Sequence, residues 1–385
     1  MQNELQKIIM AQKEIEKVVK GKSQKISKII AAILAKGHIL LEDVPGVGKT
    51  TTALAFSKVM NLSYGRVQFT PDVLPTDITG FSMFNKQTGA FEYKRGAVMC
   101  NLFLADEINR TSPKTQSALL QVMEERRITV DGKNFVIPEP FICIATQNPL
   151  GSAGTQKLPD SQLDRFMIKL SMGYPDKKNE IDILKGGSDA KKLDKIRQIL
   201  TANDVLAARA CVDAMYVAEN VYEYIAELIN ATRECEYIKV GLSTRAGLAL
   251  INLAKSYAFL TGKSFVTPED IVRAFFDISE HRIVLNNKAK MENLNCRKVL
   301  EYVKGKVEVP IVSNTDIRVE RPQAAVQAPV AQAAPQVQEV KTVQAPVAQA
   351  VPQVQPPVQA VASQPQVQNN EQSGVSQFTQ SLLDI

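Results

Sequence analysis

Short apolar runs alternate with segments of helical periodicity in the first half of the chain. Five of these runs have the length of strands, at residues 38–42, 66–69, 101–105, 141–145 and 166–170. Near-continuous apolar runs are typical of parallel strands that are buried on both faces, and their alternation with helical segments is typical of an α/β fold. The pattern therefore predicts an α/β domain with a parallel sheet over residues 1–172.

The pattern becomes helical in the next part of the chain, and residues 177–285 look helical throughout. Thr267 and Pro268, followed by acids, are typical of a helix N-cap and first turn. Gly262 is typical of a helix end. Over residues 173–318 we expect an all-helical domain, with long helices at 222–238, 244–262 and 267–283.

The last part of the chain, residues 319–385, has a different composition. The segment 326–338, VQAPVAQAAPQVQ, returns with one substitution at 343–355, a period of 17 residues. Proline at this density favours extended polyproline II segments and cannot build a core, so we expect a disordered linker over 319–372. The final residues regain an apolar pattern on one helical face, which is typical either of a frayed terminus or of a short docking motif: Phe378, Leu382 and Ile385.

Composition and charge narrow the class of protein. No apolar run approaches the roughly 18–20 residues that cross a bilayer, and the N-terminus lacks a signal-peptide core. We therefore expect a cytoplasmic protein without membrane insertion, and the five scattered cysteines predict reduced, buried thiols. The net charge of +6 is mild, and the chain has no tryptophan and no basic–aromatic stripe. Nucleic-acid binding is not expected from this composition.

The stretch ILLEDVPGVGKTT, residues 39–51, joins a predicted strand to a predicted helix through a glycine-rich turn. It is close to the pattern G-x-x-x-x-G-K-[ST], whose backbone N–H groups hold nucleotide phosphates. Lys49 is expected near the β- and γ-phosphates, and Thr50 is expected to bind Mg²⁺. Asp43 replaces the first glycine, but aspartate tolerates a positive φ better than most residues. We predict a working loop formed by Pro45, Gly46, Val47, Gly48, Lys49, Thr50 and Thr51.

An acidic pair, Asp106-Glu107, follows the predicted strand at 101–105. Asp106 is expected to hold Mg²⁺ through its water shell, and Glu107 to polarise the attacking water. Acids at a helix start are common for other reasons, but after a phosphate loop the pair indicates nucleotide hydrolysis. No N-K-x-D stretch for guanine recognition follows, so the expected nucleotide is ATP.

With these motifs in place, the chain resembles the MoxR family of AAA+ ATPases over roughly residues 15–285. The resemblance implies a three-layer α/β/α domain with a parallel sheet, followed by an all-α lid domain; the tail lies outside it. The stretches that carry it are QFTPDVLPTDITG (68–80), LFLADEINRTSPKTQSALLQVMEE (102–125), RITVDG (127–132), FICIATQNP (141–149), LPDSQLDRF (158–166) and GLSTRAGLAL (241–250).

The resemblance also implies roles for four polar residues. Asn148 matches sensor 1, which orients the attacking water, and Arg165 matches the arginine finger, which reaches the γ-phosphate of a neighbouring subunit. Arg245 matches sensor 2, and Arg110 is placed at the subunit interface. A basic residue at a helix start is locally unfavourable, which favours a ligand role for Arg245. By residue type alone, Asn148 also fits a turn and Arg165 a surface ion pair.

Two hairpins are expected as insertions, at 81–96 around Gly89 and at 126–137 around Asp131-Gly132. In proteins of the resembled family, such hairpins face a central pore and touch the client.

The resulting expectation is an ATPase that binds Mg·ATP between the α/β domain and the lid, in a site completed by an adjacent subunit of a hexameric ring. It would remodel or mature client proteins beside a separate partner with a von Willebrand factor A domain. Three alternatives stay open: a nucleic-acid-acting motor, a nucleotide-dependent scaffold with little turnover, and a magnesium-chelatase-like motor.

Overall fold

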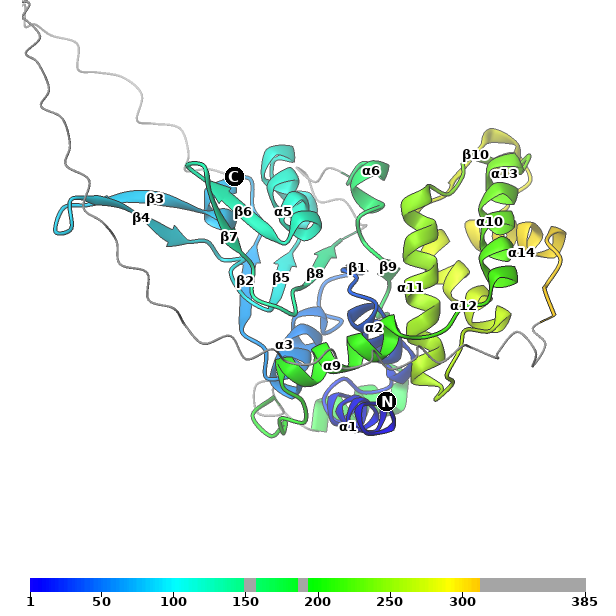
Figure 1. Ribbon diagram of the computed structural model, residues 1–385, viewed down its shortest axis with the longest axis horizontal. Coiled ribbons are helices and arrows are strands. Elements are labelled where there is room, and N and C mark those ends of the chain that lie inside the picture. The colour runs from blue at the N-terminus through cyan, green and yellow to red at the C-terminus, as the bar shows by residue number, and fades with distance from the viewer. Residues whose placement is uncertain (149–156, 186–192, 312–385) are drawn as a thin grey trace, which may run out of the picture. The chain divides into compact units, whose positions relative to one another are not determined.

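A five-stranded sheet forms the centre of the first half of the chain in the computed structural model, which describes residues 1–148, 157–185 and 193–311 (Figure 1). Its order is β2-β5-β8-β1-β9, and neighbouring strands run parallel. The five predicted strands are confirmed, with ends shifted by one or two residues: β1 Ile39–Glu42, β2 Tyr64–Gln68, β5 Leu102–Asp106, β8 Ile142–Gln147 and β9 Ile168–Leu170.

Helices cover both faces of this sheet. Alternate residues of a strand point to opposite faces: in β1, Ile39 and Leu41 join one buried apolar cluster and Leu40 joins the other. The first cluster includes residues of three helices, α1 Gln2–Glu16, α2 Ser23–Leu34 and α3 Lys49–Val59. The second includes residues of α5 Pro113–Glu125. The predicted three-layer α/β/α architecture is thus confirmed.

Both predicted hairpins are present outside the main sheet. Strand β3 Gly80–Asn85 pairs with β4 Ala90–Arg95, and β6 Arg127–Val130 pairs with β7 Lys133–Val136. Asp131 and Gly132 both have positive φ, 49° and 74°, as a two-residue hairpin turn requires. The short helices α4 Pro75–Thr79, η1 Ile108–Arg110 and α6 Asp160–Leu163 connect these elements.

The second half is mostly helical, with one correction to the prediction. Residues 177–285 are not helical throughout, because β10 Ile238–Val240 pairs with β11 Val284–Leu285 in a small antiparallel sheet. Strands of two or three residues show no periodicity, so the helices expected at 222–238 and 267–283 were extended too far. Within the described residues of this half, the helices are α7 Lys177–Lys185, α9 Ala202–Asp213, α10 Glu219–Glu234, α11 Thr244–Leu260, α12 Pro268–Ser279, α13 Asn287–Met291 and α14 Cys296–Lys306.

The predicted start of α12 is confirmed in detail. Asp270, at the third helical position, accepts hydrogen bonds from the Thr267 N–H at 3.0 Å and from the Thr267 hydroxyl at 2.9 Å. The Asp270 carboxylate therefore satisfies an N–H group at the helix start that the helix itself cannot pair.

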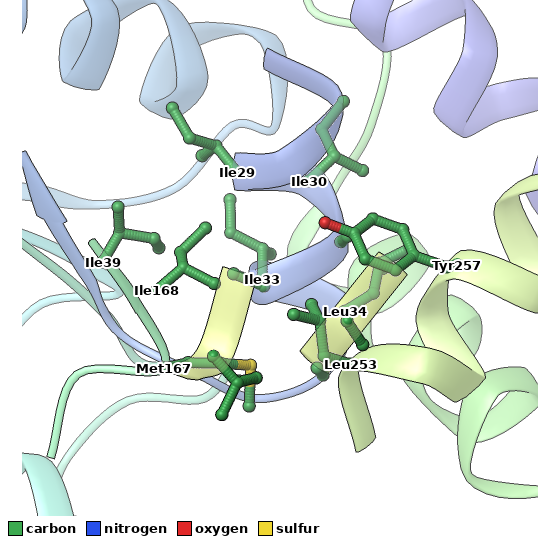
Figure 2. Packing of buried hydrophobic residues seen from close by; sticks show 14 of the residues in the cluster. Ile29, Ile30, Ile33, Leu34, Ile39, Met167, Ile168, Leu253 and Tyr257 are labelled. Atoms are coloured by element: carbon green, nitrogen blue, oxygen red, sulfur yellow. The ribbon is translucent and has the colours of Figure 1, made fainter. Parts of the chain in front are cut away.

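One apolar cluster continues from the sheet into the helical half (Figure 2). Ile30 and Leu34 of α2 belong to the same buried set as Leu253 and Tyr257 of α11. Helix α2 therefore packs against the sheet on one side and against α11 on the other.

Two further expectations can be compared with the structure. Within the described residues, no helix combines the length and apolar character needed to cross a bilayer. The cysteines there are free; three are buried, but Cys211 and Cys296 are only half-buried, against the expectation. The linker of residues 319–372 and the terminal apolar motif lie outside the described residues.

Candidate functional site

The glycine-rich turn connects β1 to α3 and forms a cavity of about 290 Å³. Gly46 and Gly48 have φ of 84° and 83°, a left-handed conformation that suits glycine. The cavity opens at the N-terminus of α3, where the backbone N–H groups of a helix favour anions. Its lining consists of Pro45, Gly46, Gly48, Lys49, Thr50, Thr51, Asp106 and Glu107. Val47 does not line it and packs half-buried against the apolar cluster instead.

Lys49 lies across the mouth of the loop. Its Nζ donates to the backbone carbonyl of Asp43 at 2.6 Å and lies 3.5 Å from that of Gln147. Burial lowers the pKa of the Lys49 ammonium, although the nearby carboxylates oppose the shift. Two backbone oxygens therefore hold this cation at the edge of the cavity.

Asp43 is not a substitute for a strained glycine, which corrects the expectation of a positive φ. It is absent from the residues with positive φ, and its N–H continues the sheet pairing to Gln147 O at 3.1 Å. Its carboxylate accepts hydrogen bonds from the Gly173 N–H at 2.6 Å and the Ser171 hydroxyl at 3.0 Å. Burial disfavours the charge, but these bonds outweigh burial and lower the pKa of Asp43. Asp43 thus ties the loop to the segment after β9.

The acidic pair closes the cavity from β5. Asp106 Oδ1 accepts a hydrogen bond from the Thr146 hydroxyl at 2.6 Å, and its Oδ2 lies 2.8 Å from Arg66 Nη2. Thr146 also accepts from the Glu107 N–H at 2.9 Å, so one hydroxyl of β8 orients both acids. The sequence analysis did not single out Thr146 or Arg66. The position of Thr146, two residues before Asn148, was the available signal.

Glu107 is held in a specific arrangement of its own. It adopts a left-handed conformation, φ 58°, and its Oε2 lies 2.7 Å from Arg110 Nη1. Arg110, expected at a subunit interface, thus contacts the expected catalytic base within the same chain. The Glu107 carboxylate is occupied by this ion pair.

The donor set suits a magnesium–nucleotide complex better than a bare metal ion. Thr50 and Asp106 bring a hydroxyl and a carboxylate to one cavity. Mg²⁺ is commonly bound by one or two such groups together with water and phosphate oxygens. Among the described residues, no group of three or more His, Cys, Asp or Glu side chains forms a metal site.

Asn148 follows β8 at the same end of the sheet as the acidic pair. It is half-buried, and its backbone carbonyl lies 3.4 Å from Asn109 Nδ2. It is not among the residues that line the phosphate-loop cavity.

The two arginines of the predicted site lie together, at another place. Arg245 pairs with Glu124 Oε1, and Arg165 Nε lies 3.6 Å from Glu124 Oε2. Arg165 and Glu124 line a second cavity, of about 300 Å³, at the end of α5. None of the described residues of the helical half lines the phosphate-loop cavity, so the expectation of a nucleotide enclosed by the lid of the same chain finds no support there.

Comparisons with known proteins agree with this architecture. A family model described as "ATPase family associated with various cellular activities (AAA)" matches residues 38–168, and one described as "AAA lid domain" matches residues 230–301. Chaperone MoxR1 of Mycobacterium tuberculosis is 35% identical over 309 residues, which cover 78% of this chain and 81% of MoxR1. The chain belongs to the MoxR family of AAA+ ATPases.

Two further proteins match along most of their length. The uncharacterized protein YeaC of Bacillus subtilis is 41% identical over 301 residues, covering 78% of this chain and 94% of YeaC. A crystal structure from Cytophaga hutchinsonii, described only as a candidate ATPase, superposes with a TM-score of 0.74 at 38% identity. It covers 80% of this chain and 96% of that protein.

Proposed function

We propose that this MoxR-family protein hydrolyses Mg·ATP at a site shared between two copies of the chain. One observation carries the proposal: Lys49, Asp106 and Glu107 surround one cavity, whereas Arg165 and Arg245 meet at Glu124 near another. A phosphoryl-transfer site needs cations on both sides of the transferred group. In a ring, the arginine pair of one subunit would face the phosphate loop of the next.

Each residue then has a distinct task. The turn N–H groups and Lys49 bind the phosphates, and Thr50 and Asp106 hold Mg²⁺, which would neutralise charge on the phosphate oxygens. Glu107 polarises the attacking water once its ion pair with Arg110 opens, and Asn148 orients that water. Arg165 and Arg245 of the neighbouring subunit stabilise the charge that develops on the γ-phosphate.

The biological task proposed is remodelling or maturation of client proteins in the cytoplasm. The chaperone name of MoxR1 supports it, as do the exposed aromatic side chains of the β3–β4 hairpin, Phe84 and Phe91. We propose a hexameric ring whose hairpins contact the client, acting beside a separate von Willebrand factor A domain protein. A nucleotide-dependent scaffold is the second candidate, because the ion pair with Arg110 occupies Glu107.

Steady-state ATP hydrolysis against protein concentration tests the proposal, for wild type, Glu107→Gln and Arg165→Ala. Turnover per subunit is expected to rise with concentration, because the site is shared. Both substitutions are expected to lower it by about 10³-fold, the scale of a lost arginine finger, while ATP binding persists.

Arg297→Ala is the matched control, since it removes an exposed arginine of α14 that pairs with Glu280 and Glu301. It is expected to leave turnover unchanged. Wild-type protein that binds ATP but never turns it over, at any concentration, would contradict the motor and favour the scaffold.

A further inference from the structure

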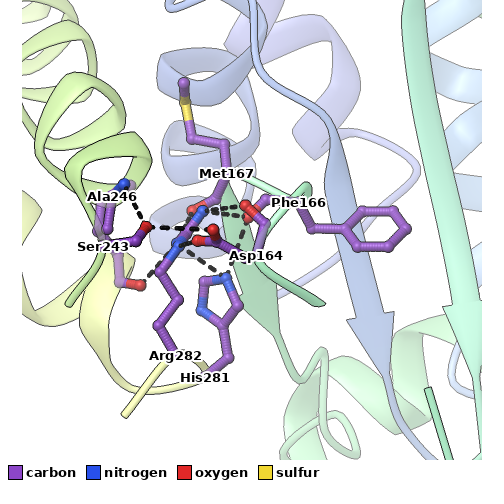
Figure 3. A network of polar contacts seen from close by, with 8 residues as sticks. Asp164, Phe166, Met167, Ser243, Ala246, His281 and Arg282 are labelled. Atoms are coloured by element: carbon purple, nitrogen blue, oxygen red, sulfur yellow. Dashed lines mark hydrogen bonds and ion pairs between the residues drawn. The ribbon is translucent and has the colours of Figure 1, made fainter. Parts of the chain in front are cut away.

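Arg282 is a buried cation that follows α12, and its guanidinium is saturated with hydrogen bonds (Figure 3). Its Nε donates to Asp164 Oδ1 at 2.8 Å, and its Nη2 donates to the carbonyls of Asp164 and Phe166 at 3.0 and 2.6 Å. Its Nη1 donates to the carbonyls of Met167 and Ile278 at 3.0 and 2.6 Å. A buried charge is costly unless it is paired and hydrogen-bonded in this way.

The acceptors of Arg282 surround Arg165 in the chain. Four of the five oxygen acceptors lie within two residues of Arg165: the carboxylate and the backbone carbonyl of Asp164 and the backbone carbonyls of Phe166 and Met167. Asp164 has a second contact, because its Oδ2 accepts from the Ser243 hydroxyl at 3.1 Å. Ser243 is the N-cap of α11, and Arg245 lies in the first turn of that helix. A single carboxylate therefore joins Arg282 to both segments that carry the arginine pair.

We propose that Arg282 and Asp164 are positioning residues for Arg165 and Arg245. The pair fixes the backbone on both sides of Arg165 and the start of α11, so both arginines are presented to the neighbouring subunit as one unit. Neither positioning residue lines the phosphate-loop cavity of its own subunit. The inference rests on the proposed function, in which the arginine pair completes the site of the next copy.

The first test is Asp164→Ala in the full chain. Because a small displacement of a catalytic group costs up to about 10²-fold in rate, turnover is expected to fall about 10- to 100-fold. The affinity of its own phosphate loop for a fluorescent ATP analogue is expected to stay within about twofold, since that loop is untouched. Arg282→Lys, which keeps the charge but loses the planar fork, should show the same split with a smaller loss.

Mixed rings show which side of the site is damaged. Glu107→Gln subunits have no base but an intact arginine pair, and Arg165→Ala subunits have the base but no finger. Asp164→Ala is expected to regain turnover when mixed with Glu107→Gln, to about a quarter of wild type at a 1:1 ratio, because half the sites meet half the fingers. Mixing it with Arg165→Ala should restore nothing, because both partners lack a working finger.

Asp277→Ala is the matched control. Asp277 of α12 also connects the helical half to the first half of the chain, because it forms an ion pair with Lys28 of α2. It also accepts a hydrogen bond from the Tyr257 hydroxyl at 2.6 Å. Asp277 forms no hydrogen bond or ion pair with residues 164–167, all of which the structure describes, so its loss should lower stability without the one-sided pattern.

Several outcomes would overturn the inference. These are wild-type turnover in Asp164→Ala, restoration by Arg165→Ala, restoration by neither partner, or the same pattern in Asp277→Ala. The mixture of Arg165→Ala with Glu107→Gln tests the shared site by itself, because Asp164 and Arg282 are intact in both subunits. If that mixture stays inactive while wild type hydrolyses ATP, the proposal of a site shared between subunits is refuted. The positioning role of Arg282 and Asp164 is then refuted as well.

Discussion

At the scale of single residues, Asp43 stands where the phosphate-loop motif has its first glycine. Its backbone conformation shows whether the loop differs from the motif in structure or only in residue type. A glycine at this position would supply a positive φ, but the chain here is extended and pairs with β8. The carboxylate instead binds the Ser171 hydroxyl and the Gly173 N–H, and the carbonyl binds Lys49. The sequence suggested that aspartate tolerates a glycine conformation, whereas the structure shows that it anchors a neighbouring segment.

This distinction predicts the effect of restoring the motif. If Asp43 damaged the loop, Asp43→Gly would strengthen nucleotide binding. We expect the opposite, a loss of about tenfold or more, because hydrogen bonds to a charged group contribute about 1.5–3 kcal/mol. Titration with a fluorescent ADP analogue measures the change. Asp43→Asn keeps the shape and one acceptor oxygen, so its loss should be smaller; tighter binding by the glycine variant would refute the anchoring role.

At the scale of elements, local signals predicted some structures and could not predict others. The turn Asp131-Gly132 and the N-cap Thr267 act within a few residues, and both were found where expected. Strands β10 and β11 pair only through tertiary contact, and two or three residues are too few for a periodic signal. Arg282 was missed for a related reason, because nothing in its local sequence indicates that its guanidinium is buried.

The β3–β4 hairpin carries two kinds of aromatic side chain: one packs against the rest of the fold, and the others are largely exposed. Tyr93 stacks on Phe135 of β7, with ring centroids 3.9 Å apart, and its hydroxyl donates to the Thr79 carbonyl. Phe84 and Phe91 contact each other edge to face at 5.4 Å but are 50% and 70% exposed. Exposed aromatic side chains contribute little burial to folding, so their presence is better explained by contact with another molecule.

We therefore expect opposite stability effects from the two pairs. The double variant Phe84→Ser/Phe91→Ser should change the free energy of unfolding by no more than about 0.5 kcal/mol, as is usual at surface sites. Tyr93→Ala should cost about 1–3 kcal/mol, because it removes a stacked ring and a hydrogen bond. Urea denaturation followed by circular dichroism measures both. A large loss in the double serine variant would mean that the exposed pair is structural.

At the scale of the whole molecule, the candidate site could be predicted only in part. Lys49, Asp106 and Glu107 come together because β1 and β5 are parallel strands that end at one edge of the sheet, so motifs that follow two predicted parallel strands could be placed together from the sequence. The meeting of Arg165 and Arg245 on Glu124 depends on how α11 docks against the end of α5. The buried residues of α11 and α5 belong to two different apolar clusters, so this placement follows from the tertiary packing of the whole fold and carries no local sequence signal.

The same packing predicts how the described part of the chain unfolds. Because α2 packs against the sheet and against α11 within one cluster, the two halves should lose structure together. Cys143 in β8 and Cys235 after α10 are free and buried, one in each half. Their modification by a thiol reagent in urea, followed by mass spectrometry, should give coincident midpoints. Leu253→Ala on α11 should lower stability by about 2–5 kcal/mol and shift both midpoints equally. Exposure of Cys235 at lower urea than Cys143 would show that the helical half unfolds by itself, and that the shared cluster does not couple this half to the sheet.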